Sequence, residues 1–198
     1  MTDAGSPGTE TGDDLPIWPH PDHELRLPPV PADERSDQTA EMLAALKFDP
    51  DGDVPNIFAT LAHHPRLLKR WSAFGGILLF RGELDPRERE LLILRTAWHC
   101  KAHYEWHNHV PIGRRTGLTA AEITRVTEGP SASGWSDTDA ALLRAADELH
   151  EDAVISDATW AALSGRYRPA QLVEIPMVVG QYHLVAFTLN SLGVQIDD

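Results

Sequence analysis

The stretch DPRERELLILRTAWHCKAHYEWHNHVPIGRRTG, residues 85–117, decides the fold of this chain. It opens with Asp-Pro-Arg-Glu, which supplies an N-cap, a proline at the first helical position and an acid at the third. We expect a helix from there to about Cys100, a break near Lys101, and a second helix that ends before Gly117, a plausible C′ glycine. This stretch therefore predicts two consecutive helices joined by a tight connection.

Helix signals recur on both sides of this stretch. Capping residues and first-turn prolines predict further helices over residues 36–46, 56–64, 65–80, 156–165 and 169–193, and two more that start at Thr119 and Ser136. We expect a kink at Pro176, because a proline removes one helical hydrogen bond. Strand alternation is scarce and no hairpin signal appears. The prediction is an all-α domain, a compact multi-helix bundle.

The N-terminal part differs from the rest in composition. Residues 1–40 hold 7 of the 15 prolines and 9 acids against 2 bases, a net charge of −7 out of −13. We divide the chain into a Pro-rich acidic arm, residues 1–35, partly disordered, and a helical domain, residues 36–198. Apolar residues in the arm predict an extended segment lying over the domain or over a neighbouring subunit: Leu15, Ile17, Trp18, Leu25 and Leu27. A featureless tail is the alternative.

Composition also narrows the classes of function. A net charge of −13 disfavours nucleic acids and anionic membrane surfaces as partners, because both would repel the chain. A single cysteine excludes an intramolecular disulfide. We expect no apolar run of the roughly 18–20 residues that cross a bilayer. The first residues lack the pattern of a secretory signal, so we predict a soluble, cytoplasmic protein.

Three ionisable residues lie on apolar helix faces at 100° per residue. Glu90 shares the face of Ile93, whereas Glu105 and His109, one turn apart, share the face of Trp106. A buried acid or histidine is costly unless it is paired, so we expect the three side chains to converge. Burial and mutual charge would then create the mixed proton affinities of general acid–base catalysis. A structural Glu–His network that locks two helices is the alternative.

These residues also carry a family resemblance. RERELLILRTAWHCKAHYEWHNHVPIGRRTGLTAAEI, residues 87–123, resembles the carboxymuconolactone decarboxylase family, which includes the alkylhydroperoxidase-D-like proteins. GGILLFRGELDP and QLVEIPMVVGQYHLVAFTLNSLGV extend the likeness over roughly residues 55–195. The resemblance implies a small helical fold, a homo-oligomer (a trimer or hexamer), and chemistry on a small-molecule substrate with no cofactor and no metal.

The chain departs from the peroxidase branch of that family at two positions. The family pattern is a glutamate, a Cys-x-x-Cys pair that begins twelve residues later, and a histidine. Glu90 and His109 fit its ends, but Ala102 and Glu105 stand in place of the cysteines. A dithiol peroxidase cycle needs both sulfurs. The resemblance therefore implies the cysteine-free, decarboxylase-like branch, with Glu90, Glu105 and His109 as catalytic residues.

Other side chains are candidates with competing interpretations. Tyr104, Trp106, Tyr182 and His183 are candidate substrate-binding residues, although Trp106 at helical spacing also suits core packing. Cys100, His103 and His107 have the spacing of metal ligands if one helix runs through all three, and His99 extends the row. The expected break near Lys101 argues against such a site, and solvated surface histidines are the alternative. Cys100 is interpreted as a small buried hydrophobe.

Three functions remain open from the sequence. The first is a cofactor-free lyase, decarboxylase or isomerase acting on a small cyclic or carboxylated molecule through Glu90, Glu105 and His109. The second is a thiol peroxidase that uses the lone Cys100. The third is a non-catalytic ligand-binding protein on the same scaffold.

Overall fold

The computed structural model describes residues 15–16, 18–47 and 51–197, and within them every regular element is a helix. The elements are the 3-10 helix η1 (Ala32–Glu34) and the α-helices α1 (Asp37–Ala44), α2 (Asn56–Leu61), α3 (Pro65–Phe80), α4 (Pro86–His99), α5 (His103–Arg115), α6 (Ala120–Glu128), α7 (Asp137–Glu151), α8 (Asp157–Ser164) and α9 (Pro169–Leu192). The predicted all-α class is confirmed.

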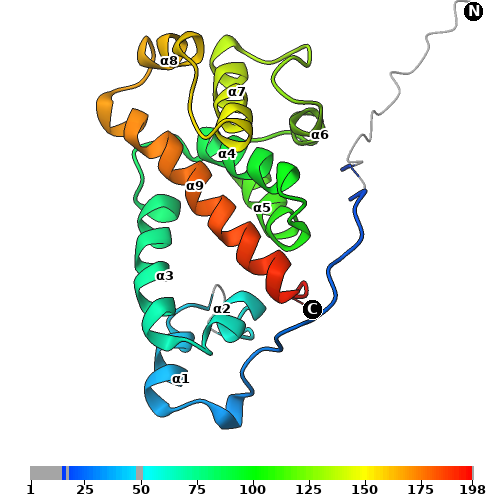
Figure 1. Cartoon of the computed structure of the whole chain (residues 1–198), viewed down its shortest axis with the longest axis vertical. Helices are drawn as coiled ribbons and strands as arrows, with labels where there is room; N and C mark the ends of the chain where they lie inside the picture. Colours follow the sequence, from blue (N-terminus) through cyan, green and yellow to red (C-terminus); the bar gives the residue numbers. More distant parts are fainter. Residues whose placement is uncertain (1–14, 17, 48–50, 198) are drawn as a thin grey trace, which may run out of the picture.

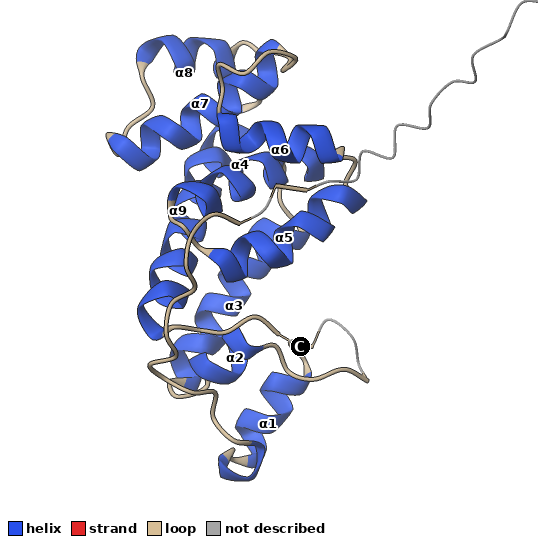
Figure 2. Ribbon diagram, turned by 90° about the vertical axis from the view of Figure 1, so that its right-hand side faces the viewer, coloured by secondary structure: helices blue, strands red, loops and turns tan. Residues whose placement is uncertain are grey.

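Helix α4 is the centre of the fold. It packs against α5, α6, α7 and α9, and every residue from Arg89 to Ala97 is buried. Figure 1 shows α9 running diagonally across the molecule past α4 and α5, with α6–α8 at one end and α1–α3 at the other; Figure 2 shows the same arrangement from the side. A helix that is covered on all sides must bury its polar residues along with its apolar ones.

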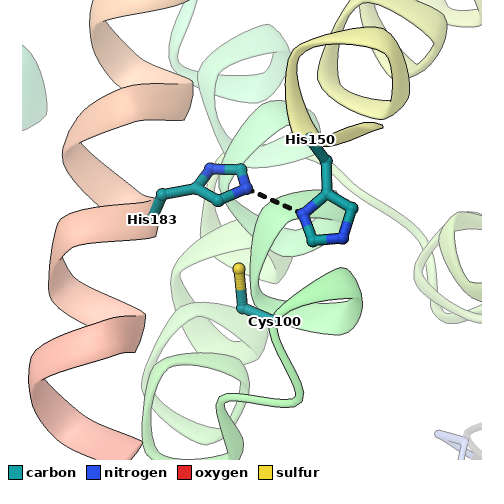
Figure 3. Close-up of side chains that lie close together, drawn as sticks. All are labelled: Cys100, His150 and His183. Carbon is teal, nitrogen blue, oxygen red and sulfur yellow. Dashed lines mark hydrogen bonds between the residues drawn. The ribbon is translucent and has the colours of Figure 1, made fainter. Parts of the chain in front are cut away.

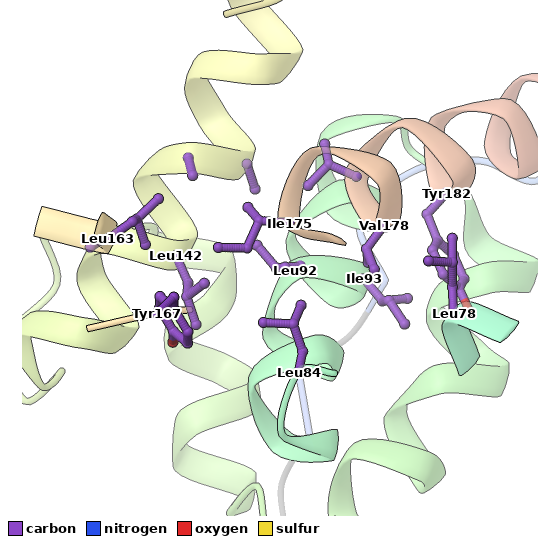
Figure 4. Close-up of a cluster of buried hydrophobic side chains, with 14 residues drawn as sticks. Leu78, Leu84, Leu92, Ile93, Leu142, Leu163, Tyr167, Ile175, Val178 and Tyr182 are labelled. Atoms are coloured by element: carbon purple, nitrogen blue, oxygen red, sulfur yellow. The ribbon is translucent and has the colours of Figure 1, made fainter. Parts of the chain in front are cut away.

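The largest apolar cluster joins α4 to α7, α8 and α9 (Figure 4). Leu92 and Ile93 of α4 lie beneath Ile175 and Val178 of α9, and all four residues are fully buried. Fully burying a side chain of this size contributes about 1.5–3 kcal/mol. This cluster holds α9 rigidly above the α4–α5 pair, where the candidate site lies.

The predicted starts and stops of the central helices are confirmed. Lys101 has φ of +52° and separates α4 from α5, and Gly117 has φ of +106° just beyond α5. Thr119 forms a capping box with Glu122 at the start of α6. Pro176 lies inside α9, which continues as one helix from Pro169 to Leu192.

We expected no segment long and apolar enough to cross a bilayer, and the length and composition of one helix contradict this expectation. Helix α9 is long and apolar enough to cross a bilayer, and it is the single such helix in the described part of the chain. However, half of its most apolar window is buried against the rest of the domain. We therefore interpret α9 as a core helix, which passes the same test because it is apolar on several sides.

The described part of the N-terminal arm lies along the domain, as one of the two sequence interpretations expected. Trp18 packs edge-on against Trp98 at 5.5 Å between ring centroids, and the backbone amides of Arg26 and Leu27 donate to the carbonyl of Leu192. Leu25 is exposed, and Ile17 falls outside the described residues. Gly193, with φ of +64°, lies against the arm, where a Cβ atom would meet the carbonyl oxygen of Glu24 at 1.8 Å.

Candidate active site

Glu90 and His109 meet between α4 and α5, as their helical positions predicted. His109 Nδ1 lies 2.7 Å from Glu90 Oε2, and both residues are buried. The other carboxylate oxygen of Glu90 accepts two bonds from the guanidinium of Arg89, at 3.0 and 3.1 Å. An acceptor-only carboxylate requires that Nδ1 carry the proton. When the imidazole is in its neutral form, the lone pair that can take up a proton is therefore on Nε2.

Tyr182 of α9 covers this pair from the opposite side. Its ring meets the His109 ring edge to face at 5.0 Å between centroids. Burial, with the charges of Glu90 and Glu105 nearby, raises the pKa of the Tyr182 phenol well above its ordinary value. The phenol therefore remains a neutral hydrogen-bond donor at physiological pH.

Glu105, one turn before His109 on α5, is buried, and neither of its carboxyl oxygens has a hydrogen-bond partner among the residues that the structure describes. Burial raises the pKa of Glu105 well above its ordinary range, and the neighbouring charge of Glu90 raises it further. A buried carboxyl without a partner is costly when ionised, so burial favours the protonated form of this side chain. The site thus combines a carboxyl whose neutral form is favoured with a buried imidazole on the same helix.

Two of the four predicted substrate-binding residues have other contacts. The buried Trp106 packs with Trp98 and Trp18 in an aromatic cluster, with ring centroids 5.4 and 5.9 Å away. The Tyr104 hydroxyl donates to Asp197 Oδ2 at 2.6 Å, and burial with this carboxylate raises the pKa of Tyr104. Tyr104 also lines a cavity of about 290 Å³, together with His103 and residues near the C-terminus. Their roles toward a substrate remain predictions.

The remaining candidates lie on different sides of the α4–α5 junction. The positive φ of Lys101 ends α4, so Cys100 is not on the same helix as His103 and His107. His103 stacks on Trp18 at 5.1 Å and bonds to the arm residue Asp22. The row of metal ligands weighed from the sequence therefore does not form.

His183, the fourth predicted substrate-binding residue, lies beside Cys100 and His150. Burial raises the pKa of the Cys100 thiol to about 12, and the charge of Glu105 adds to the effect. A thiol with this pKa supplies little of the thiolate that attacks peroxides.

Sequence reasoning missed Arg89 and misplaced Arg95 and His99. At 100° per residue, Arg95 and His99 lie on the side of α4 opposite Glu90, and their contacts with Asp147 show that α7 covers that side. Arg95 is buried and forms a bidentate ion pair with Asp147, at 2.6 and 3.0 Å, and His99 Nε2 lies 2.7 Å from the same carboxylate. The adjacent charges of Arg89 and Glu90 were the one sequence signal for the missed arginine.

Comparison with known proteins agrees with this architecture. Residues 65–148 match the model of the Carboxymuconolactone decarboxylase family. This match covers less than half of the chain, so residues 65–148 are similar to that family, and the helical fold agrees with the likeness. The resemblance seen in the sequence is confirmed. No curated protein sequence matches the chain.

Solved structures share the fold at low sequence identity. An uncharacterized peroxidase-related protein from Ralstonia eutropha JMP134, with an alkylhydroperoxidase AhpD core, is 23% identical, with a TM-score of 0.73 over 89% of this chain and 94% of that one. A peroxidase-related protein from Silicibacter sp. TM1040 is 18% identical, with a TM-score of 0.73 over 88% and 94%. A cysteine-to-alanine variant of the debrominase Bmp8, in complex with 2,3,4-tribromopyrrole, is 14% identical, with a TM-score of 0.72 over 89% and 94%.

Proposed function

We propose that this protein is a cofactor-free acid–base enzyme, a lyase, decarboxylase or isomerase, acting on a small cyclic or carboxylated organic molecule. The observation that carries the proposal is the buried carboxyl of Glu105, which has no partner of its own and lies on the same helix face as His109. An orphaned buried carboxyl is expensive for stability, and a functional role is the usual reason that one is retained.

The proposed roles of Glu105 and His109 in proton transfer follow from the protonated form that burial favours in Glu105. Glu105 donates its proton to carbon, and His109 Nε2 accepts one, while Glu90 and Arg89 hold the imidazole in the required tautomer. In a decarboxylation, the carbon–carbon bond to the carboxylate breaks, its electron pair enters a conjugated enolate, and carbon dioxide leaves. The proton from Glu105 then forms the new carbon–hydrogen bond. A proton from solvent, passed on by His109, then returns the Glu105 carboxylate to its protonated form.

The structural neighbours suggest the size of the substrate. The debrominase Bmp8 variant holds 2,3,4-tribromopyrrole, a small ring, and the family name refers to a carboxylated lactone. Both names denote small ring compounds, which suggests a substrate of similar size. We propose Tyr182 as the residue that contacts such a ring first, because its neutral phenol already lies across the face of His109.

The other two functions are less well supported. A peroxidase that depends on Cys100 requires a thiolate, and the raised pKa of this thiol disfavours one. Loss of peroxide consumption in a Cys100→Ser variant would nevertheless favour it. A non-catalytic ligand-binding protein would bind the same small rings without converting them, and mass analysis of the recovered ligand separates this case from the first.

We predict that His109→Ala lowers turnover by about 10²–10⁴-fold, because it removes the proposed proton acceptor. The measurement is deuterium uptake and substrate loss by mass spectrometry, with carboxylated γ-lactones and 2,3,4-tribromopyrrole as probes. The control is His107→Gln, an exposed histidine of the same helix, which should retain full turnover. If His109→Ala kept wild-type turnover of a probe that the enzyme converts, the imidazole would have no catalytic role.

We also infer that a second copy of the chain covers an apolar stripe on α9, which gives the predicted homo-oligomer. Val173, Met177, Leu184 and Phe187 lie on one face of this helix and are 44–66% exposed. Replacing both Met177 and Phe187 by glutamate should reduce the assembly to monomers in light scattering. A wild-type protein that is already monomeric would contradict the inference.

The cytoplasmic location of the protein remains a prediction.

A further inference from the structure

Cys100, His150 and His183 converge on one point between three helices. Cys100 is the C-cap residue of α4, His150 lies near the end of α7, and His183 lies in the middle of α9 (Figure 3). Their potential ligand atoms, one from each side chain, all lie within 4.8 Å of one another. Figure 3 shows the sulfur of Cys100 pointing toward the two imidazole rings.

We propose that these three side chains form a binding site for a zinc ion. Zn²⁺ would displace the proton of the Cys100 thiol to solvent on binding, and the resulting thiolate with two imidazoles is a donor set that suits this borderline-soft ion. In a tetrahedral zinc site, nitrogen and sulfur ligand atoms lie about 3.3–3.6 Å apart. The observed spread of up to 4.8 Å exceeds this by roughly 1.2–1.5 Å, which side-chain rotations can close. The fourth position would be open to water.

The histidine contacts prepare the site for a metal. His183 Nδ1 lies 2.8 Å from the carbonyl oxygen of Val179, which only accepts, so this nitrogen carries a proton. Nε2 of His183 lies 2.9 Å from His150 Nδ1, and in the neutral form of the ring it is the nitrogen with the lone pair that a metal needs. A backbone carbonyl that orients the non-ligating nitrogen is the outer-shell contact typical of metal-bound histidine.

A further ring holds His150 in place. His99 stacks on His150 with centroids 4.6 Å apart, and its Nε2 is anchored to Asp147 on the same helix as His150. Asp147 is committed to Arg95 and His99, so it is not available as a fourth ligand. The site lies outside the Glu90–His109 pair, and its expected role is to tie α4, α7 and α9 together.

The experiment uses the full chain without an affinity tag, stripped with a chelator and titrated with Zn²⁺ and, separately, Co²⁺. We expect one ion per chain, a thiolate-to-cobalt charge-transfer absorption, slower alkylation of Cys100 in the presence of Zn²⁺, and a higher melting temperature. Cys100→Ser should abolish the cobalt absorption, and His150→Gln or His183→Gln should each weaken Zn²⁺ binding at least about tenfold.

His107→Gln is the matched control, an exposed histidine outside the cluster that should bind Zn²⁺ like the wild type. Variants are compared only after circular dichroism shows the native helical content. Alkylation of the wild-type thiol keeps the test independent of any variant. No stoichiometric binding, unchanged alkylation of Cys100 with Zn²⁺, or binding that survives Cys100→Ser with full affinity would each overturn the proposal.

Discussion

Replacing Glu105 by leucine should make the protein more stable at pH 8 while abolishing its turnover. The carboxyl of Glu105 is buried with no hydrogen-bond partner, which costs about 1–3 kcal/mol of stability. Leucine removes this cost and fills most of the same volume, so the melting temperature should rise. Lost turnover follows because the proposed proton donor is gone. Differential scanning calorimetry and the deuterium-uptake assay measure the two effects on one sample.

The gain in stability of Glu105→Leu over the wild type should increase as the pH rises. The folded-state pKa of Glu105 is raised above the unfolded value near 4.5, by burial first and by the charge of Glu90 second. The folded protein therefore holds a proton that the unfolded chain has lost, and stability falls as pH rises from about 5 toward the folded-state pKa. Glu90, Cys100 and Tyr182 are the titratable groups coupled to it. A leucine at position 105 does not titrate, so the variant should not lose this stability as the pH rises.

A matched control is Glu128→Leu, which changes an exposed glutamate of α6 and should leave the pH dependence as it is in the wild type. Glu105→Gln keeps the shape and removes the charge, so it should also flatten the pH dependence. If Glu105→Leu lowered the melting temperature at pH 8, the carboxylate would be ionised and well solvated. The proposal that Glu105 holds a proton in the folded protein would then be wrong.

Replacing Glu90 by alanine should produce the largest loss of stability, about 3–5 kcal/mol. Glu90 is fully buried and is the shared acceptor of Arg89 and His109, so its removal leaves two buried donors unpaired. The exposed pair of Glu83 and Arg168, 3.1 Å apart, is the contrast. Glu83→Ala should cost about 0–1 kcal/mol, because water screens that pair. Urea unfolding at pH 7 compares the two variants.

Glu90→Gln separates a catalytic role from a purely structural one. The amide can still bond to His109, so most of the stability should remain, but it no longer dictates the tautomer of the ring. Turnover should therefore fall by about 10²–10⁴-fold while the fold persists. If turnover and stability instead fell in proportion across both variants, Glu90 and His109 would only lock α4 to α5.

Much of the local architecture could be predicted from the sequence because its causes are local. The proline and acid that follow Asp85 start α4, and the left-handed backbone of Lys101 separates α4 from α5. Periodicity along α4 and α5 placed Glu90 and His109 on faces that meet. The resemblance added the family, because the motif positions that define it lie within this one pair of helices.

The same reasoning failed where several helices surround one. Helical angles assume one buried and one solvent-facing side, but α4 is covered by α5, α6, α7 and α9 together. On that assumption Arg95, opposite Glu90 on the helix, would face solvent, whereas the structure buries it in an ion pair with Asp147. The second arginine, Arg89, was missed for a related reason, since its importance depends on the carboxylate beside it being out of water.

By itself, the sequence determined the helices, their ends, and the acid–imidazole pair on adjoining helices, because hydrogen bonding and apolar periodicity act over a few residues. Only the tertiary structure decided that Glu105 has no partner and that Cys100 lies beside His150 and His183. Those relations join residues up to 83 positions apart, from Cys100 to His183. They exist only because packing α7 and α9 around α4 removes water from the space between them.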